Sequence, residues 1–215
     1  MAVSSAKGGV WNGNQLGNRI ALFDFDGTLT SRDTFTDFHL KRFGAAKVVT
    51  AACGALLSRP LSKIADRTKI KEAFVSSMWS GASAEEYLSH AKFYAEHEID
   101  KILLACAMDV FLKHLELDDT VYIVTASMRD WVAFWASRYG VKVIGTEMEA
   151  VNGRLTGRFK TPNCRGQEKV SRVKAEIELD KYGRIFAYGN SAGDKEMLSI
   201  ADEAVYRWER VPRLD

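Results

Sequence analysis

The segment "ALFDFDGTLT" at residues 21–30 places two aspartates, Asp24 and Asp26, directly after a run of apolar residues. In an extended chain, residues i and i+2 project to the same side, so we expect both carboxylates to face one site. Two carboxylates held together repel each other unless they share a cation or a proton. Mg²⁺ prefers oxygen ligands of this kind, and Gly27 permits a sharp turn just after them. The spacing therefore predicts a magnesium-dependent reaction centre.

Alternating strands and helices are the elements that must position these aspartates. The apolar runs that predict buried parallel strands are Ile20–Phe23, Val121–Val124, Val141–Ile144 and Ile185–Tyr188, with a weaker one at Ala204–Tyr206. Helical patterns separate them, one with Trp131 and Trp135 on a shared face and another starting near Arg165. The fold class is therefore α/β, a Rossmann-like open parallel sheet, in which ligands bind at the carboxyl ends of the strands.

Two insertions interrupt this alternation. Residues 35–98 contain no strand pattern and are expected to form a helical cap inserted after the first strand; "SAEE" at 83–86 is a capping box and "RPLS" at 59–62 marks a helix break. The second insertion contains Asn152-Gly153, which predicts a tight hairpin turn. The expected organisation is a flexible tail at 1–18, a core at 19–34 and 99–215, and the cap at 35–98.

Composition excludes several classes of protein. The 30 basic and 28 acidic residues give a net charge of +2, so we expect no nucleic-acid partner. Cys53, Cys106 and Cys164 lack metal-ligand spacing, which favours reduced thiols in a cytoplasmic protein, and we interpret Cys164 as a packing residue. The tail lacks the apolar core of a signal peptide. Oligomeric state is not indicated.

The longest apolar run, at 43–57, is interrupted by Lys47 and is too short for a membrane span. A packed helix is the favoured interpretation. Peripheral contact with a membrane stays open as the alternative.

Four motifs resemble those of the haloacid dehalogenase superfamily, most of whose members are Mg²⁺-dependent phosphatases. "DFDGTLT" resembles the first motif, and "VYIVTAS" (121–127), "CRGQEKV" (164–170) and "YGNSAGDKEM" (188–197) follow in the family's order. The resemblance implies that Asp24 is the nucleophile and Asp26 the general acid–base. It also implies phosphate contacts and a metal site. The implied phosphate-binding residues are Gly27, Thr28, Thr125, Ala126 and Lys169, and the implied metal ligands are Asp24, Asp26, Asn190 and Asp194. Asn190 departs from the pattern, because the superfamily often has Asp there.

The expected chemistry follows from charge. A phosphate dianion repels an attacking carboxylate, and Mg²⁺ bridging Asp24 and the phosphate removes that repulsion. Lys169 supplies a second positive charge, while the Thr125 hydroxyl and the amides around Gly27 donate to the remaining oxygens. Attack by Asp24 gives an aspartyl-phosphate; Asp26 protonates the leaving alcohol and then deprotonates the hydrolytic water.

The cap suggests a branch of the family. A helical lobe directly after the first motif resembles the phosphoserine phosphatase branch, in which Asp33 occupies the position of a Glu that binds the substrate's amine. Ala126 and Ser127 stand where those enzymes have two glycines. "TAS" and "CRGQEKV" are more similar to the group containing phosphatidylglycerophosphatase C. The expected substrate is a small phosphate monoester, with a lipid headgroup phosphate or phosphoserine as alternatives.

Two non-catalytic interpretations compete with the enzyme. A receiver domain is disfavoured by the cap and by the D-x-D spacing. A phosphate-binding pseudoenzyme, with Asn190 weakening the metal site, is the stronger rival. Ser127 is expected to be a helix cap, with a supporting role in the site as the alternative.

Overall fold

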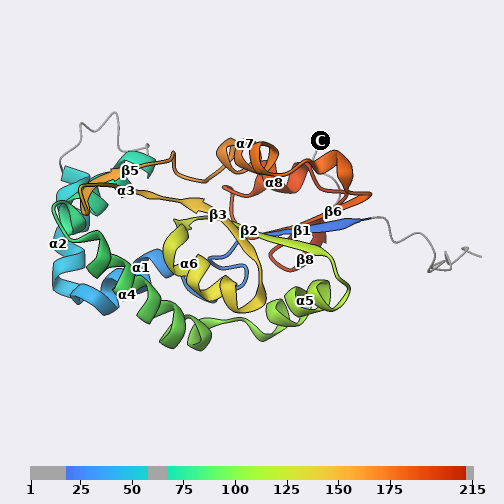
Figure 1. Ribbon diagram of the computed structural model, residues 1–215, viewed down its shortest axis with the longest axis horizontal. Coiled ribbons are helices and arrows are strands. Elements are labelled where there is room, and N and C mark those ends of the chain that lie inside the picture. The colour runs from blue at the N-terminus through green and yellow to red at the C-terminus, as the bar shows by residue number, and fades with distance from the viewer. Residues whose placement is uncertain (1–17, 58–66, 212–215) are drawn as a thin grey trace, which may run out of the picture.

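The computed structural model describes residues 18–57 and 67–211 as a parallel sheet with helices on both faces and a group of helices at one end (Figure 1). The strands are β1 (Arg19–Phe23), β2 (Thr120–Met128), β3 (Lys142–Thr146), β4 (Met148–Val151), β5 (Arg154–Phe159), β6 (Arg184–Gly189), β7 (Glu203–Tyr206) and β8 (Glu209–Val211). The α-helices are α1 (Thr34–Phe43), α2 (Ala45–Leu57), α3 (Arg67–Trp79), α4 (Ala84–His97), α5 (Ala105–Glu116), α6 (Arg129–Ala136), α7 (Gln167–Glu176) and α8 (Lys195–Ser199).

The main sheet has the strand order β3-β2-β1-β6-β7-β8, with the first five strands parallel and β8 antiparallel to β7. Strand β1 lies in its middle, so Phe23 pairs with Ile123 on one side and Tyr188 on the other. The expectation of an α/β parallel sheet is confirmed. Each of the five apolar runs forms a strand, although β2 continues to Met128, well past the predicted end.

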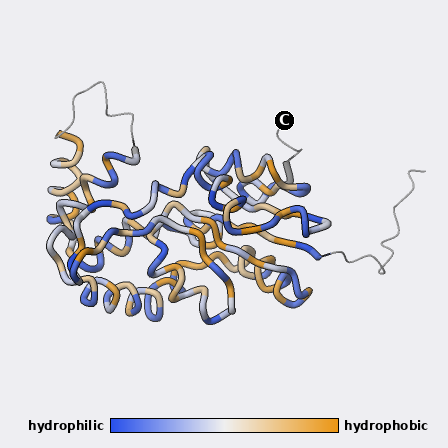
Figure 2. Tube along the Cα trace, turned by 45° about the horizontal axis from the view of Figure 1, so that its top comes forward, coloured by the Kyte–Doolittle hydropathy of each residue, from blue (hydrophilic) through white to orange (hydrophobic). Residues whose placement is uncertain are grey.

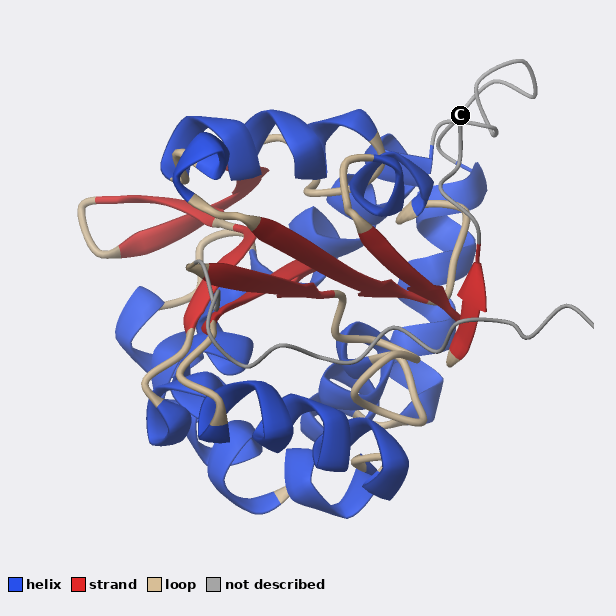
Figure 3. Cartoon of the chain, turned by 90° about the vertical axis from the view of Figure 1, so that its right-hand side faces the viewer, coloured by secondary structure: helices blue, strands red, loops and turns tan. Residues whose placement is uncertain are grey.

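Residues Ile20 to Phe23 of β1 are fully buried, because helices cover both faces of the sheet (Figure 3). One face packs against Phe111 of α5 and Trp135 of α6. The other packs against Val173 of α7 and Leu198 of α8. Hydrophobic residues are accordingly concentrated along the central strands (Figure 2). Strands covered on both sides are expected to be continuously apolar, which is why apolar runs alone identified them.

Helices α1–α4, called the cap from here on, follow β1 in the chain and lie to the left in Figure 1. Ser83 is the N-cap of α4 and accepts a hydrogen bond from the Glu86 backbone N–H, as the "SAEE" motif predicted. The 43–57 run begins with Phe43 and Gly44, the last residue and the C-cap of α1, and its remainder forms α2. The "RPLS" segment and residues 1–17 of the expected tail lie outside the described residues. Within the described part of the chain, no helix combines the length and apolarity needed to cross a bilayer.

Strands β4 and β5 form an antiparallel hairpin that extends from the core to the cap, where β5 runs beside α3 (Figure 1). Asn152 and Gly153, at φ 48° and 75°, form its turn, so the predicted hairpin is confirmed. The Leu155 carbonyl accepts from the Gly81 N–H at 2.8 Å, and the Leu155 N–H donates to the Ala82 carbonyl at 2.9 Å. Backbone hydrogen bonds therefore join the hairpin to the cap.

Candidate active site

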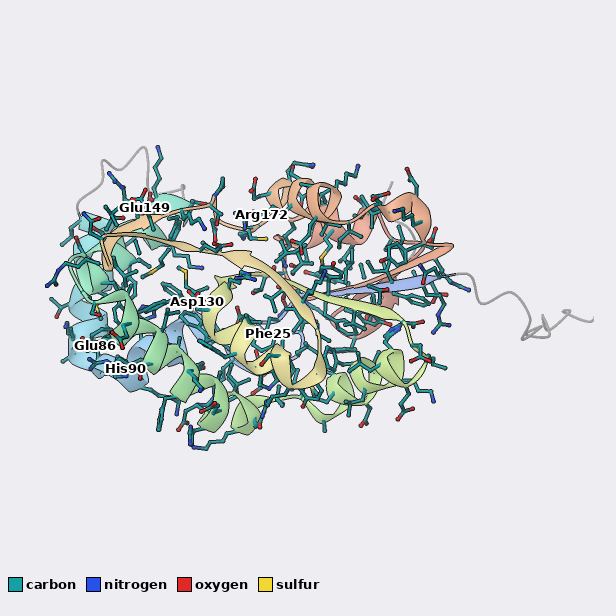
Figure 4. The ribbon with its side chains drawn as sticks, viewed as in Figure 1. Phe25, Glu86, His90, Asp130, Glu149 and Arg172 are labelled. Atoms are coloured by element: carbon teal, nitrogen blue, oxygen red, sulfur yellow. The ribbon has the colours of Figure 1, made fainter. Side chains whose placement is uncertain are left out.

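The end of β1 places Asp24 at the carboxyl edge of the sheet. Its carboxylate is buried, and Oδ2 accepts a hydrogen bond from the Thr28 hydroxyl at 3.0 Å. Phe25 points to the opposite side and packs edge-on against Trp135, with 5.2 Å between ring centroids (Figure 4). The alternation of the extended chain thus sends Phe25 into the core and leaves Asp24 and Asp26 at one cavity.

Gly27 allows two motifs to meet. Its φ is +74°, a conformation that favours glycine, and a Cβ there would lie 2.0 Å from the Asn190 side-chain nitrogen. Any larger residue at position 27 would displace Asn190. The first and fourth motifs therefore come into contact because residue 27 has no side chain.

Lys169 connects three of the motifs. It lies in the first turn of α7, fully buried, and its ammonium donates to Asp24 Oδ1 at 2.7 Å, to Asp194 Oδ1 at 2.7 Å and to the Val124 carbonyl at 2.6 Å. Burial disfavours the charged ammonium, but the carboxylates of Asp24 and Asp194 outweigh it and raise the pKa of Lys169. The lysine is therefore held as a cation between two carboxylates.

The loop after β6 fixes Asp194. Its Oδ2 accepts hydrogen bonds from the Ser191 hydroxyl at 2.7 Å, the Ser191 N–H at 2.9 Å and the Asn190 N–H at 3.2 Å. Burial acts to raise the pKa of Asp194, but the Lys169 charge and these hydrogen bonds lower it. Asp194 is therefore an anion in a fixed orientation.

Asp26 has a separate set of partners. Its Oδ1 accepts from the Thr34 N–H at 2.7 Å and the Thr34 hydroxyl at 2.6 Å, and its Oδ2 accepts from the Ser127 hydroxyl. Trp131 Nε1 in turn donates to the Thr34 hydroxyl at 3.1 Å. The expectation of a helix cap at Ser127 was wrong, because β2 continues through Ser127 and its hydroxyl is directed at Asp26 instead.

The pKa values of both aspartates of the first motif are raised. Burial raises the pKa of Asp24 to about 7, since it outweighs the opposing charge of Lys169. Burial also raises the pKa of Asp26, reinforced by the negative charge of Asp33 and opposed by the bonds from Ser127 and Thr34. For Asp26, a raised pKa is suited to a carboxyl group that must carry a proton at neutral pH.

A cavity of about 360 Å³ opens over these groups. The sequence-predicted residues that line it are Asp24, Asp26, Gly27, Asp33, Ala126, Lys169, Asn190 and Asp194. Residues that sequence reasoning did not assign to the site also line it: Ser31, Arg32, Arg165, Ser191 and Gly193. The available signal was their position in the chain: Arg165, Ser191 and Gly193 lie within the third and fourth motifs, and Ser31 and Arg32 directly follow the first.

Two predicted phosphate contacts lie behind the cavity wall. Thr125 is fully buried, and its hydroxyl accepts a hydrogen bond from the Ser127 N–H at 3.0 Å. Thr28 is also buried, with its hydroxyl on Asp24. In this arrangement both threonines hold neighbouring groups of the site in place, while Ala126 provides the surface that the second motif presents to the cavity.

The donors around the cavity fit a hard cation. Asp24, Asp194 and the Asn190 amide offer oxygen atoms, and the described residues of the lining include no histidine or cysteine. Across residues 18–57 and 67–211, no cluster of three His, Cys, Asp or Glu side chains forms a ready-made metal site. Cation binding here would therefore depend on the amide of Asn190, on backbone oxygens and on the substrate.

An open parallel sheet of this kind binds its ligand at the carboxyl ends of the strands, where the aspartate after the central strand and the buried lysine against it lie. The chain belongs to the haloacid dehalogenase-like hydrolase family, which matches residues 21–199. The superfamily that the four motifs suggested is thereby confirmed.

The chain is also similar to several known proteins. The chain is 34% identical to Protein CicA of Caulobacter vibrioides over 196 residues, which cover 87% of this chain and 85% of CicA. A Bordetella pertussis protein of unknown function has a similar structure, with a TM-score of 0.72, 25% identity and coverage of 88% and 89%. A phosphoserine phosphatase in apo form shares the fold, with a TM-score of 0.57, 17% identity and coverage of 88% and 86%.

Proposed function

We propose that this protein is a Mg²⁺-dependent phosphatase that hydrolyses a small phosphate monoester through an aspartyl-phosphate on Asp24. The observation that carries the proposal is the contact of Lys169 with Asp24 and Asp194 at 2.7 Å each, at the floor of a cavity of about 360 Å³. A buried cation beside a carboxylate nucleophile is suited to binding a phosphate dianion. The volume is adequate for a small substrate.

In the first half of the reaction, an Asp24 carboxylate oxygen bonds to phosphorus while the bond from phosphorus to the alcohol oxygen breaks. Asp26 gives its proton to the departing oxygen. In the second half, Asp26 takes a proton from a water molecule, whose oxygen attacks phosphorus and releases Asp24 and inorganic phosphate. Thr34 and Ser127 hold the Asp26 carboxyl group in one orientation during both transfers.

Mg²⁺, held by Asp24, Asn190 and Asp194, would supply positive charge that offsets the repulsion between the carboxylate and the phosphate. We propose that the Asp26 carboxyl group transfers protons, which is supported by the hydrogen bonds it accepts from Thr34 and Ser127. Gly27 and Ala126 provide the backbone that faces the phosphate, and Asp33 is the acidic group available to a cationic part of the leaving alcohol.

A lipid headgroup phosphate is the second candidate substrate. Helix α2 exposes Val49 (59%) and Leu57 (85%), and it carries no acidic residue in its first turn. An apolar helix face of this kind is suited to shallow contact with a lipid surface. Hydrolysis of phosphatidylglycerophosphate in vesicles in preference to its water-soluble headgroup would support this candidate.

The experiment that tests the proposal is release of inorganic phosphate from p-nitrophenyl phosphate, with Mg²⁺ or with EDTA. We expect activity that requires Mg²⁺ and falls by at least about a hundredfold in Asp24→Asn, since the nucleophile is removed. Asp109→Asn, at an exposed position on α5, is the matched control and should keep wild-type activity. Absence of phosphate release by the wild type, or full activity of Asp24→Asn, would overturn the proposal and favour a phosphate-binding pseudoenzyme.

A further inference from the structure

Arg165 contributes a positive charge to the catalytic cavity that the proposed reaction does not use. It lies in the "CRGQEKV" segment, four residues before Lys169, and its side chain crosses over Gly193 in the loop after β6. A Cβ at Gly193 would lie 2.7 Å from Arg165 Cγ and 2.8 Å from its Nε. The absence of a side chain at residue 193 therefore lets the guanidinium arm lie along the cavity wall.

The guanidinium of Arg165 has no carboxylate partner among the residues that the structure describes. Other arginines of this chain are paired: Arg138 forms a two-point contact with Asp100, and Arg158 contacts Glu149. The lysine of the cavity is paired as well, because Lys169 contacts both Asp24 and Asp194. Arg165 is therefore available to an anion from outside the protein.

Lys71 adds positive charge on the same side. It reaches from α3 of the cap to donate to the carbonyl of Ala126 at 2.6 Å, and its ammonium lies 4.5 Å from the centroid of the Phe35 ring. Burial lowers the pKa of Lys71 to about 8, against the raising effect of Asp26 and Asp33. Ala126 also lines the cavity, so Lys71 from the cap and Arg165 from the core both lie at this wall. Neither of these two cations contacts a carboxylate of residues 18–57 or 67–211.

We infer that the natural substrate carries a second anionic group on its leaving alcohol, and that Arg165 binds this group while Lys169 and the metal bind the reactive phosphate. The inference rests on the proposed phosphatase function and specifies its substrate class. A guanidinium recognises carboxylates and phosphate oxygens through two parallel N–H donors, so a carboxylate and a phosphodiester share the required chemistry. Lys71 raises the local positive potential without being the group that binds.

The test compares substrates that differ in one group. Glycerol 3-phosphate has a neutral leaving group, 3-phosphoglycerate has a carboxylate, and deacylated phosphatidylglycerophosphate has a phosphodiester; p-nitrophenyl phosphate serves as the substrate without a second anion. We expect wild-type kcat/KM to be about tenfold to a hundredfold higher for an anion-bearing substrate than for glycerol 3-phosphate, as for a hydrogen-bonded charge pair. Arg165→Gln should remove this preference, mainly through KM, and lower kcat/KM on p-nitrophenyl phosphate by much less than on the anion-bearing substrates.

Arg165→Lys and Arg138→Gln complete the design. Arg165→Lys keeps the positive charge but lacks the two parallel N–H donors of a guanidinium, so it should retain part of the preference for anion-bearing substrates. Arg138→Gln removes an arginine outside the cavity and should retain the full preference. An unchanged preference in Arg165→Gln, or an equal loss on every substrate including p-nitrophenyl phosphate, would overturn the inference. If the wild type releases phosphate from none of the substrates, the phosphatase proposal is overturned and the inference with it. If the wild type hydrolyses p-nitrophenyl phosphate but does not prefer substrates with a second anion, only the inference is overturned.

Discussion

Lys169 lies 2.7 Å from a carboxylate oxygen of Asp24 and 2.7 Å from one of Asp194, so a single buried ammonium joins the ends of β1 and β6. Replacing it by glutamine leaves two buried carboxylates without their cation and removes charge from the phosphate site. We expect Lys169→Gln to lower kcat on p-nitrophenyl phosphate by about 10²–10³-fold. Its free energy of unfolding should fall by about 3–5 kcal/mol, as for a broken buried ion pair.

Phosphate release and urea unfolding measure the two effects. Lys181→Gln removes an exposed lysine paired with Glu178 and is the matched control, expected to change neither quantity appreciably. Activity of Lys169→Gln within tenfold of the wild type would show that the ammonium does not act on the substrate.

Thr34 and Ser127 hold the Asp26 carboxyl group by hydrogen bonds, in the proposed position of the acid that protonates the leaving group. The activity lost when Asp26 is replaced should therefore depend on how strongly the leaving group needs a proton. Asp26→Asn cannot protonate a departing alcohol, so the loss should exceed about a hundredfold for an alkyl phosphate. The loss in kcat/KM, which reports formation of the aspartyl-phosphate, should be much smaller for p-nitrophenyl phosphate, because its phenolate leaves without a proton. The second half, in which Asp26 takes a proton from water, should slow for every substrate. Ser127→Ala should rank the substrates in the same order but lose less activity on each, because it removes one hydrogen bond to the Asp26 carboxyl group and leaves that group in place.

Steady-state kinetics on glycerol 3-phosphate, 3-phosphoglycerate and p-nitrophenyl phosphate check this ranking. Ser137→Ala, which removes an exposed serine hydroxyl at the end of α6, is the control and should leave the ranking unchanged. Equal losses in kcat/KM on all three substrates would contradict the role of Asp26 as the proton donor to the leaving group.

Local patterns in the sequence were sufficient for much of the fold. The continuous apolar runs identified β1, β2 and β3 because most of their residues are buried, whereas β6 and β7 are only partly buried and β7 gave the weakest pattern. Asn152-Gly153 identified the hairpin because few other residues adopt its turn. Strand β8 was missed, since three residues give no periodicity. Docking of the hairpin on the cap was also missed, because backbone hydrogen bonds between distant segments leave no trace in residue type.

Sequence motifs predicted the site residues whose type is required for the chemistry. They did not predict contacts between side chains from distant segments of the chain. The D-x-D spacing after an apolar run placed Asp24 at a site, and the resemblance to the family motifs placed Lys169 and Asp194 there; all three line one cavity. Ser127 was misread because the end of β2 decides whether its hydroxyl caps a helix or reaches Asp26. Arg165 was left unassigned because its role depends on the path of its side chain over Gly193.

Gly157 of β5 packs closely against α3 of the cap, so we expect a side chain added at this position to lower the free energy of unfolding. Gly157 has φ +78°, and a Cβ there would lie 2.8 Å from Ser76 Cα in α3, a backbone atom that cannot easily move. Gly157→Ala therefore combines the cost of positive φ with a steric clash, and we expect a loss of about 2–4 kcal/mol. Figure 4 labels Glu149 of β4, whose carboxylate accepts hydrogen bonds from Thr156 and Arg158 of β5 and so joins the two strands of the hairpin.

Gly153→Ala separates the two contributions. Gly153 has φ +75°, but a Cβ added there would meet no described atom within 4 Å, so this variant should lose only the conformational part, about 1–2 kcal/mol. Urea unfolding of both variants measures the difference. Equal stabilities of Gly157→Ala and Gly153→Ala would show that the hairpin does not press on α3.

His39 predicts a loss of stability in acid. Its Nε2 accepts a hydrogen bond from Trp79 Nε1 at 2.9 Å, so the neutral ring must carry its proton on Nδ1, which donates to the Phe35 carbonyl at 2.6 Å. Burial lowers the pKa of His39 from 6.5 to about 4. Between these values the unfolded chain binds more protons than the folded protein, so stability is fully present above about pH 6.5 and falls as the pH decreases toward 4.

The expected loss from this one residue is about 2 kcal/mol between about pH 7.5 and pH 5, measured as the free energy of urea unfolding. His39→Phe should be less stable at neutral pH, because Trp79 loses its acceptor, yet its stability should decline less steeply with acid than that of the wild type. His97→Gln, at an exposed position of α4, should keep the wild-type slope. A parallel decline in His39→Phe and wild type would mean that protonation of His39 does not oppose folding, and that the contact with Trp79 tolerates a charged ring.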